Sequence, residues 1–128
     1  MPQVWIIQEW ATNTGSFLGE YNAQSAAVRA AFDVALKFLS QNPPSYWRFP
    51  QTRQLTDECE GLVEIRFFAD KVQQRPLGFY GPGRMAFTLL FWATEKGSKF
   101  VPRDACAIAL KRKKQVEKYG LSRTYDVE

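Results

Sequence analysis

The chain has 128 residues, of which 45% are hydrophobic and 23% are charged. This length fits one domain with its own hydrophobic core, and the composition argues against a disordered chain or a membrane protein. The sequence contains no histidine, which excludes imidazole general bases, Ser–His or Cys–His nucleophiles and a conventional zinc site. We therefore expect no metal and no cofactor, and any catalysis must use Lys, Arg, Tyr, Asp or Glu.

The charge is distributed unevenly along the chain. Residues 1–95 contain 8 Lys/Arg and 9 Asp/Glu, whereas residues 96–128 contain 9 Lys/Arg and 4 Asp/Glu. The net charge of +4 therefore comes from the C-terminal third. A basic region of this kind is expected to attract a polyanionic partner such as a nucleic acid.

The N-terminal part predicts a strand followed by a helix. Residues 3–10 are rich in β-branched and aromatic side chains, which favours a strand. Residues 22–41 repeat apolar side chains at helical spacing, with Asn22 available as an N-cap. Two prolines follow and must end this helix. Residues 43–60 are too irregular for either period and predict a long ordered loop.

The C-terminal part predicts a β-meander and a second helix. Alternation of apolar and polar side chains after Gly61 favours a half-buried strand with Glu64 and Arg66 on one face. Turn-forming residues and further apolar runs continue the pattern. The expected strands cover residues 62–68, 75–80 and 85–93, and the expected helix begins near Pro102.

The cysteines and the N-terminus indicate the expected compartment. Cys59 and Cys106 are not spaced as a CxxC pair, and no basic segment leads into an apolar one at the N-terminus. Long apolar runs such as residues 85–93 fall far short of the roughly 20 residues that a membrane-spanning helix needs. We therefore expect a cytoplasmic protein with two free, buried thiols and no association with a membrane.

Several segments together resemble the RelE/ParE superfamily of toxins, and in particular the phage-related HigB-like branch of type II toxin–antitoxin systems. The segment GLVEIRFF at 61–68 resembles the superfamily's "gLwElR", and QRPLGFY at 74–80 resembles "yRvlyf". LLFWATEKGSKFVP at 89–102 resembles the HigB-like "LLhgFvKKtqktP", after which Ala109 and Arg112 match an "A..R" pattern. The chain departs from these patterns at Val63, Pro76, Ala93 and Glu95.

This resemblance implies a fold and a function. The implied fold is an α+β domain with a small antiparallel RelE-like sheet, ordered as strand, helix, three-strand meander and C-terminal helix. The domain would cover residues 1–120, with residues 121–128 as a C-terminal tail. The implied function is that of a toxin that inhibits translation by ribosome-dependent cleavage of mRNA. Its partners would be mRNA on the ribosome and a helix-turn-helix antitoxin.

The cationic side chains supply the candidate site, because attack by the RNA 2′-hydroxyl requires a bound phosphate and neutralised charge. The candidate catalytic residues are Arg66, Arg75, Lys96 and Lys99, which could converge where the sheet meets the terminal helix. The candidate RNA-binding residues are Tyr80, Arg84, Arg103, Lys111, Arg112 and Tyr119, with the tyrosines available for base stacking.

Structural roles compete with these assignments. Arg66 could pair with an acidic neighbour in the sheet, and the basic run at residues 111–114 could be a solvated helix face. A non-enzymatic function is the alternative for the whole protein: a ParE-like gyrase inhibitor, or a relic that retains binding of RNA or of an antitoxin.

Overall fold

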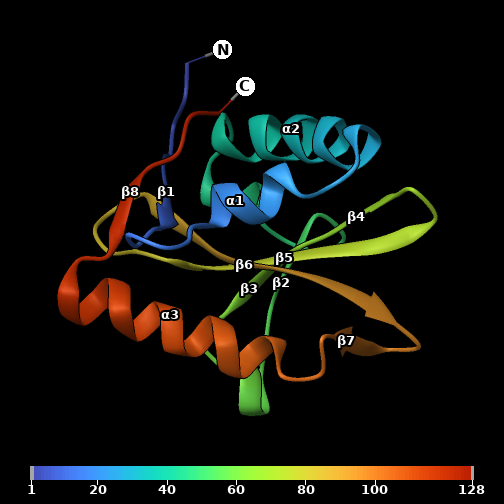
Figure 1. Ribbon diagram of the computed structural model, residues 1–128. Coiled ribbons are helices and arrows are strands. Elements are labelled where there is room, and N and C mark those ends of the chain that lie inside the picture. The colour runs from blue at the N-terminus through green and yellow to red at the C-terminus, as the bar shows by residue number, and fades with distance from the viewer. Residues whose placement is uncertain (1, 128) are drawn as a thin grey trace.

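Helices cover both faces of one large sheet, as Figure 1 shows, with α1 and α2 on one side and α3 on the other. The computed structural model describes residues 2–127. The strands are β1 Ile6–Trp10, β2 Thr52–Gln54, β3 Val63–Ile65, β4 Phe67–Ala69, β5 Val72–Tyr80, β6 Ala86–Lys96, β7 Lys99–Val101 and β8 Ser122–Thr124. The helices are α1 Phe17–Asn22, α2 Ala26–Ser40 and α3 Ala105–Tyr119, with short 3₁₀ helices η1 Pro44–Tyr46 and η2 Asp57–Cys59.

The sheet is mixed and contains eight strands. Its main order is β2-β3-β5-β6-β1-β8, with β4 beside β5 and β7 beside β6. β1 pairs with β6 in parallel, starting at Ile6 opposite Ala86, and the other pairs are antiparallel. The prediction of a small antiparallel RelE-like sheet is therefore wrong. Three-residue strands are too short to show a period of two in the sequence, and the pairing of β1 with β6 joins segments about 80 residues apart.

The first helical region consists of two helices where the sequence predicted one. The Ser16 side chain accepts a hydrogen bond from the Gly19 amide and caps α1, and Ser25 caps α2 through the Val28 amide. Asn22 is the last residue of α1, so the prediction that it caps the long helix is wrong. The buried face of α2 packs with the sheet through Val28, Phe32, Leu36, Leu39, Ile7, Phe87 and Leu89.

A second core lies between the sheet and α3. Leu62, Leu77, Phe79 and Leu90 from the sheet pack with Ala105, Ala109 and Val116 from the helix. The helix ends at Gly120, whose φ of 65° is the left-handed conformation that glycine adopts readily. On this face α3 contacts β6, β5 and β1.

Residues 121–128, expected to form a tail, extend the sheet in their described part. β8 pairs antiparallel with β1, and the Tyr125 amide donates a hydrogen bond to the Ile7 carbonyl. The Tyr125 side chain is buried in the core beside α2. Both ends of the chain consequently lie near each other at one end of the molecule (Figure 1).

The cysteine prediction is also wrong, because Cys59 and Cys106 form a disulfide. The bond joins η2 to the first turn of α3, two segments 47 residues apart. Spacing along the chain could not indicate this pairing, since it depends on how the segment before β3 folds over α3. No helix within residues 2–127 is long and apolar enough to cross a membrane.

Candidate functional site

Arg66 and Arg75, two of the candidate catalytic residues, lie opposite each other in the sheet. β3 and β4 pair with β5 in one continuous register, with Glu64 opposite Leu77 and Phe67 opposite Gln74. Arg66 lies between these two pairs and therefore faces Arg75. Because side chains alternate along a strand and Leu77 packs under α3, both arginines are on the face that carries α3.

Glu64 is the centre of this group. Its side chain is completely buried, and its Oε2 accepts a hydrogen bond from Arg66 and forms an ion pair at 3.1 Å with the Nε of Arg53. Its other oxygen, Oε1, has no hydrogen-bond partner within the described part of the chain. A buried acceptor without a partner costs about 1–3 kcal/mol of stability, so such a group in a folded protein is a functional candidate.

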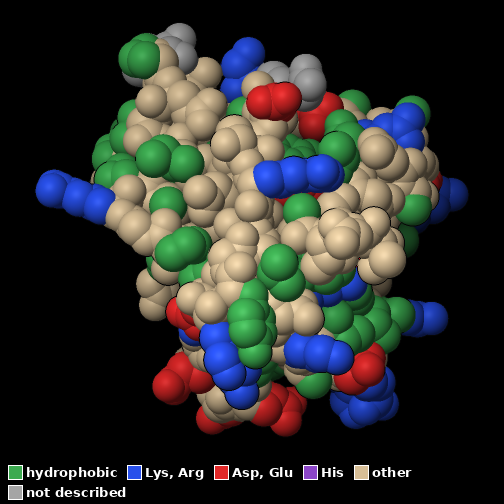
Figure 2. All heavy atoms as spheres, turned by 60° about the vertical axis from the view of Figure 1, so that its left-hand side comes forward, with side chains coloured by type: hydrophobic (Ala, Val, Ile, Leu, Met, Phe, Trp, Pro, Cys, Tyr) green, Lys and Arg blue, Asp and Glu red, His purple; other side chains and the backbone are tan. Residues whose placement is uncertain are grey.

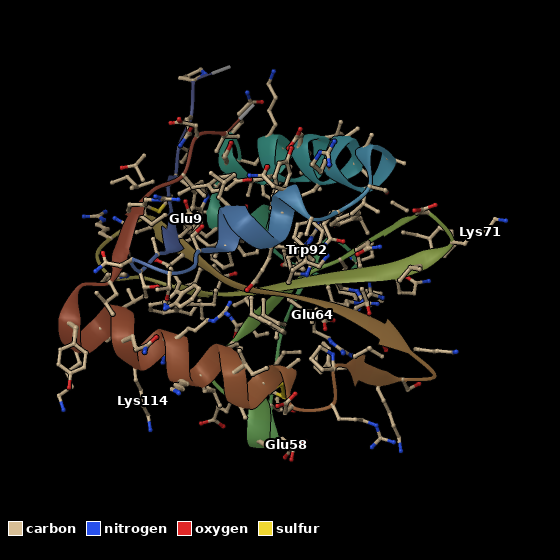
Figure 3. The ribbon with its side chains drawn as sticks, in the orientation of Figure 1. Glu9, Glu58, Glu64, Lys71, Trp92 and Lys114 are labelled. Carbon is tan, nitrogen blue, oxygen red and sulfur yellow. A yellow bond between two sulfur atoms is a disulfide. The ribbon has the colours of Figure 1, made fainter. Side chains whose placement is uncertain are left out.

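Figure 3 shows Glu64 between the sheet and the level of α3, whereas Glu58 and Lys114 point outward. Two features control access to its carboxylate. Arg53 lies across from Glu64 on the edge strand β2, and half of its side chain is exposed. Arg66 is less exposed and lies 4.9 Å from the ring centre of Phe49, itself at the surface. Arg53 is therefore the more exposed of the two arginines that contact the carboxylate, and Arg66 the more buried.

Each of the three guanidinium nitrogens of Arg75 donates a hydrogen bond to a neighbouring group. Its Nε donates to Glu95 at 2.8 Å, and its terminal nitrogens donate to the Gln74 carbonyl and the Gln73 side chain. Only 4% of the residue is exposed. Burial keeps the Arg75 guanidinium from presenting two nitrogens to a phosphate, and its charge is paired with Glu95.

Lys96 and Lys99 lie together but apart from the arginines. They face each other across the β6–β7 hairpin, and both are exposed. Glu95 links the two groups, because it pairs with Arg75 and lies opposite Phe100 in the same hairpin. Lys99, Phe100 and Arg103 line a cavity of about 640 Å³ beside the first turns of α3. The structure therefore brings Arg66 to Arg75 and Lys96 to Lys99, with Glu95 between the pairs.

Tyr80 and Arg84, expected to bind RNA, lie at an aromatic pocket on the opposite face. The ring of Tyr80 is 5.8 Å from Trp5 and 5.7 Å from Trp47, and all three line a pocket of about 290 Å³. Burial raises the pKa of the Tyr80 phenol, and a hydrogen bond with Gln54 opposes that shift. Arg84 is exposed in the turn whose neighbouring residues line the same pocket.

The candidate RNA-binding residues of α3 divide into buried and exposed ones. Arg112 points inward, donates to Glu20 and to the Leu90 carbonyl, and lies 3.8 Å from the centre of the Trp10 ring. Its guanidinium is thus a structural group. The exposed cationic side chains of α3 and the loop before it are Arg103, Lys111, Lys114 and Lys118, and Tyr119 is also exposed. Figure 2 shows charged side chains of both signs at the bottom of the molecule, where α3 and η2 lie.

Sequence reasoning placed Glu64 on the same strand face as Arg66 but gave it no role in the site. An acidic residue between two apolar positions of a strand, next to an arginine on its own face, is the pattern that could have indicated it. Arg53 lay in a segment expected to be a loop, so its pairing with Glu64 required β2. Among residues 2–127, no group of His, Cys, Asp and Glu side chains could hold a metal ion.

Comparisons of the chain with protein-family models, with curated proteins and with solved structures find no match. The functional assignment therefore depends on the side chains and their arrangement.

Proposed function

We propose that the protein binds single-stranded RNA on the Glu64–Arg66 face and cleaves it with the RNA's own 2′-hydroxyl as the nucleophile. The observation that carries this proposal is the buried Glu64 carboxylate, whose Oε1 is unpaired while two arginines hold its Oε2. A base and cations within reach of one another are what this reaction needs, and no histidine is required.

In the proposed reaction, a phosphate of the RNA takes the place of Glu64 as the partner of Arg53. The Arg53 side chain is half exposed and can swing outward with the phosphate, which uncovers the carboxylate. Arg66 stays on Glu64 and orients it. Oε1 then accepts the proton of the 2′-hydroxyl, the 2′-oxygen attacks phosphorus, and the bond to the 5′-oxygen breaks. The products are a 2′,3′-cyclic phosphate and a 5′-hydroxyl that takes its proton from water, and Glu64 then gives its proton to the hydroxide that remains.

The cations beyond the centre would bind the backbone of the RNA. Lys96 and Lys99 on the hairpin, with Arg103 at the start of α3, extend positive charge along one side of this face. Phosphate contacts of this kind position a strand without reading its sequence. Tyr80 and Arg84 lie on the other face and would need a strand that passes around the sheet edge.

The biological setting is part of the same proposal. We infer a toxin that cleaves mRNA on the ribosome in the cytoplasm and is inhibited by a helix-turn-helix antitoxin. The support is the succession of segments at 61–68, 74–80 and 89–102, together with the base and the arginines on one sheet face. The sheet itself gives no support, because it is larger than the one that this family predicts.

The direct test is Glu64→Gln, which keeps the shape of the side chain but removes the base. Cleavage of ribosome-bound mRNA should fall by about a hundredfold or more, the contribution typical of a general base. Glu9→Gln is the matched control, because Glu9 is equally buried and its carboxylate is also held by an arginine, Arg123 at 2.8 Å, on the far side of the sheet. Unfolding in urea measures stability, which both substitutions should lower, whereas only the first should abolish cleavage. Equal cleavage by the two variants would contradict the proposal.

The second candidate is a non-enzymatic binding protein, which the burial of Arg75 and its hydrogen bonds to neighbouring groups favour. Induced expression separates the two. An RNA-cleaving protein produces new mRNA 5′ ends at ribosome positions, whereas a gyrase inhibitor produces DNA damage without them. Growth inhibition with neither effect would indicate binding alone.

A further inference from the structure

The Cys59–Cys106 disulfide lies in the wall of an open cavity. The cavity has a volume of about 640 Å³ and is formed by η2, the β6–β7 hairpin and the first turns of α3. In Figure 1 the green η2 segment lies directly against the orange start of α3. Cys59 is partly exposed, whereas only 7% of Cys106 is exposed. Cys59 is therefore the more accessible of the two cysteines that line the cavity.

The two sulfurs differ as leaving groups. Cys106 is the second residue of α3, a helix of 15 residues, and lies at the end where backbone amides point outward. The positive end of the helix dipole stabilises a thiolate at this position, and a stabilised thiolate leaves faster in disulfide exchange. Attack at Cys59 with departure of Cys106 is thus favoured by access and by electrostatics together.

The rest of the cavity wall carries charges of both signs. Lys99 and Arg103 supply two cations, and Glu58 and Asp104 supply two carboxylates. Phe100 and Leu110 provide apolar surface between them. This combination is complementary to a small thiol that carries both carboxylate and ammonium groups, and less so to a neutral or purely anionic one.

We propose that this cavity is a thiol–disulfide exchange site for a zwitterionic low-molecular-weight thiol. The thiolate of the small molecule attacks the Cys59 sulfur, a mixed disulfide forms there, and Cys106 leaves as a thiolate. A second molecule of the same thiol attacks the mixed disulfide, which releases the oxidised dimer of the small thiol and leaves Cys59 reduced. Two electrons pass from two thiols to the protein disulfide.

Exchange at this site would remove the covalent link between η2 and α3. The backbone hydrogen bonds of η2 are local, from Cys59 to Thr56 and from Glu60 to Asp57. The disulfide is the covalent link between this segment and α3. A disulfide in a reducing compartment is usually transient or regulatory, so exchange also reconciles the bond with a cytoplasmic location.

The test measures how fast the full-length, folded protein opens its disulfide in three thiols: glutathione, which is zwitterionic, N-acetylcysteine, which is anionic, and 2-mercaptoethanol, which is neutral. Free thiols are trapped at set times and counted by mass spectrometry. Each rate is divided by the rate for the same protein unfolded in urea, which cancels the intrinsic reactivity of each reagent. The normalised rate with glutathione should exceed the other two by about tenfold, the lower range of electrostatic rate enhancement.

Two double variants locate the preference. Lys99→Gln with Arg103→Gln should remove the advantage of glutathione, whereas Lys111→Gln with Lys114→Gln changes the charge equally on the exposed outer part of α3 and should keep it. The trapped mixed disulfide should map to Cys59. The proposal is overturned by equal normalised rates in the three thiols, by an advantage that survives in the Lys99/Arg103 variant, by a mixed disulfide at Cys106, or by a disulfide that no thiol opens in the folded protein.

Discussion

Arg112 and Glu20 meet at a gap in the sheet, where they take the place of a missing strand. Along one of its edges, β6 pairs with β1 up to Leu89 and with β7 from Thr94 onward. In the gap, the Leu90 carbonyl accepts a hydrogen bond from Arg112 and the Trp92 amide donates one to Glu20. The two side chains come from helices on opposite faces and pair with each other at 2.6 Å. One ion pair therefore satisfies the strand edge and connects both layers of helices.

Removal of this pair should destabilise the protein. Arg112→Ala leaves the Glu20 carboxylate and the Leu90 carbonyl without this partner, and the free energy of unfolding should fall by about 1–3 kcal/mol, as for partly buried acceptors that lose a charged donor. Lys111→Ala, one residue earlier and exposed, should change it by less than about 0.5 kcal/mol. Urea denaturation measures both. If the Arg112→Ala protein keeps its stability but no longer binds RNA, Arg112 belongs to the RNA-binding surface instead.

The long helices and strands could be predicted from the sequence, whereas the short strands and the pairing between strands could not. The α2 helix shows helical spacing of its apolar residues, and β5 and β6 contain apolar runs long enough to indicate strands. β2, β7 and β8 have three residues each, and they form because the edges of β3, β6 and β1 are available for pairing. Edge pairing of this kind depends on the tertiary structure.

The candidate site was predictable to a similar extent. Alternation along β3 correctly placed Glu64 and Arg66 on one face, and the register of β5 added Arg75. The sequence could not show that Arg75 is buried among acceptors or that Arg112 points inward, because exposure on a basic helix depends on what the helix covers. The pairing of Cys59 with Cys106 could not be predicted either, because it depends on the tertiary structure.

Gly78 should not tolerate a side chain. It follows the irregularity in the β5–β6 register, and a Cβ there would lie 2.5 Å from the Phe87 ring and 2.5 Å from the Thr88 carbonyl oxygen. Gly78→Ala should lower the free energy of unfolding by about 3 kcal/mol or more, because ring and backbone must both shift. Gly19→Ala, in α1 with 3.7 Å to its nearest neighbour, should raise it by about 0.4–1 kcal/mol. Similar thermal denaturation of both variants would show that the sheet can rearrange at Gly78.

Tyr80 should make the protein less stable in alkali. Burial raises the pKa of its phenol in the folded state, so the unfolded chain loses that proton first as the pH rises. The free energy of unfolding should therefore fall as the pH rises past about 10, the pKa of a free tyrosine. Tyr80→Phe should lose less stability over this range. Because Tyr119 is 66% exposed, the Tyr119→Phe variant should behave like the unmodified protein. Urea denaturation between pH values of about 8 and 11 compares the three.

Lys96 and Lys99 should contribute to RNA cleavage without contributing to stability. Both side chains are exposed on the β6–β7 hairpin, and exposed substitutions usually change stability by less than about 0.5 kcal/mol. Loss of positioned charge near a reacting phosphate typically costs about a hundredfold in rate. Lys96→Ala with Lys99→Ala should therefore retain its melting temperature and lose ribosome-dependent cleavage. Lys37→Ala with Lys71→Ala removes the same charge from α2 and from the β4–β5 turn and should retain both properties. Equal losses in the two double variants would mean that net charge alone drives RNA binding. Full cleavage by the Lys96/Lys99 variant would confine the chemistry to Glu64 and its arginines.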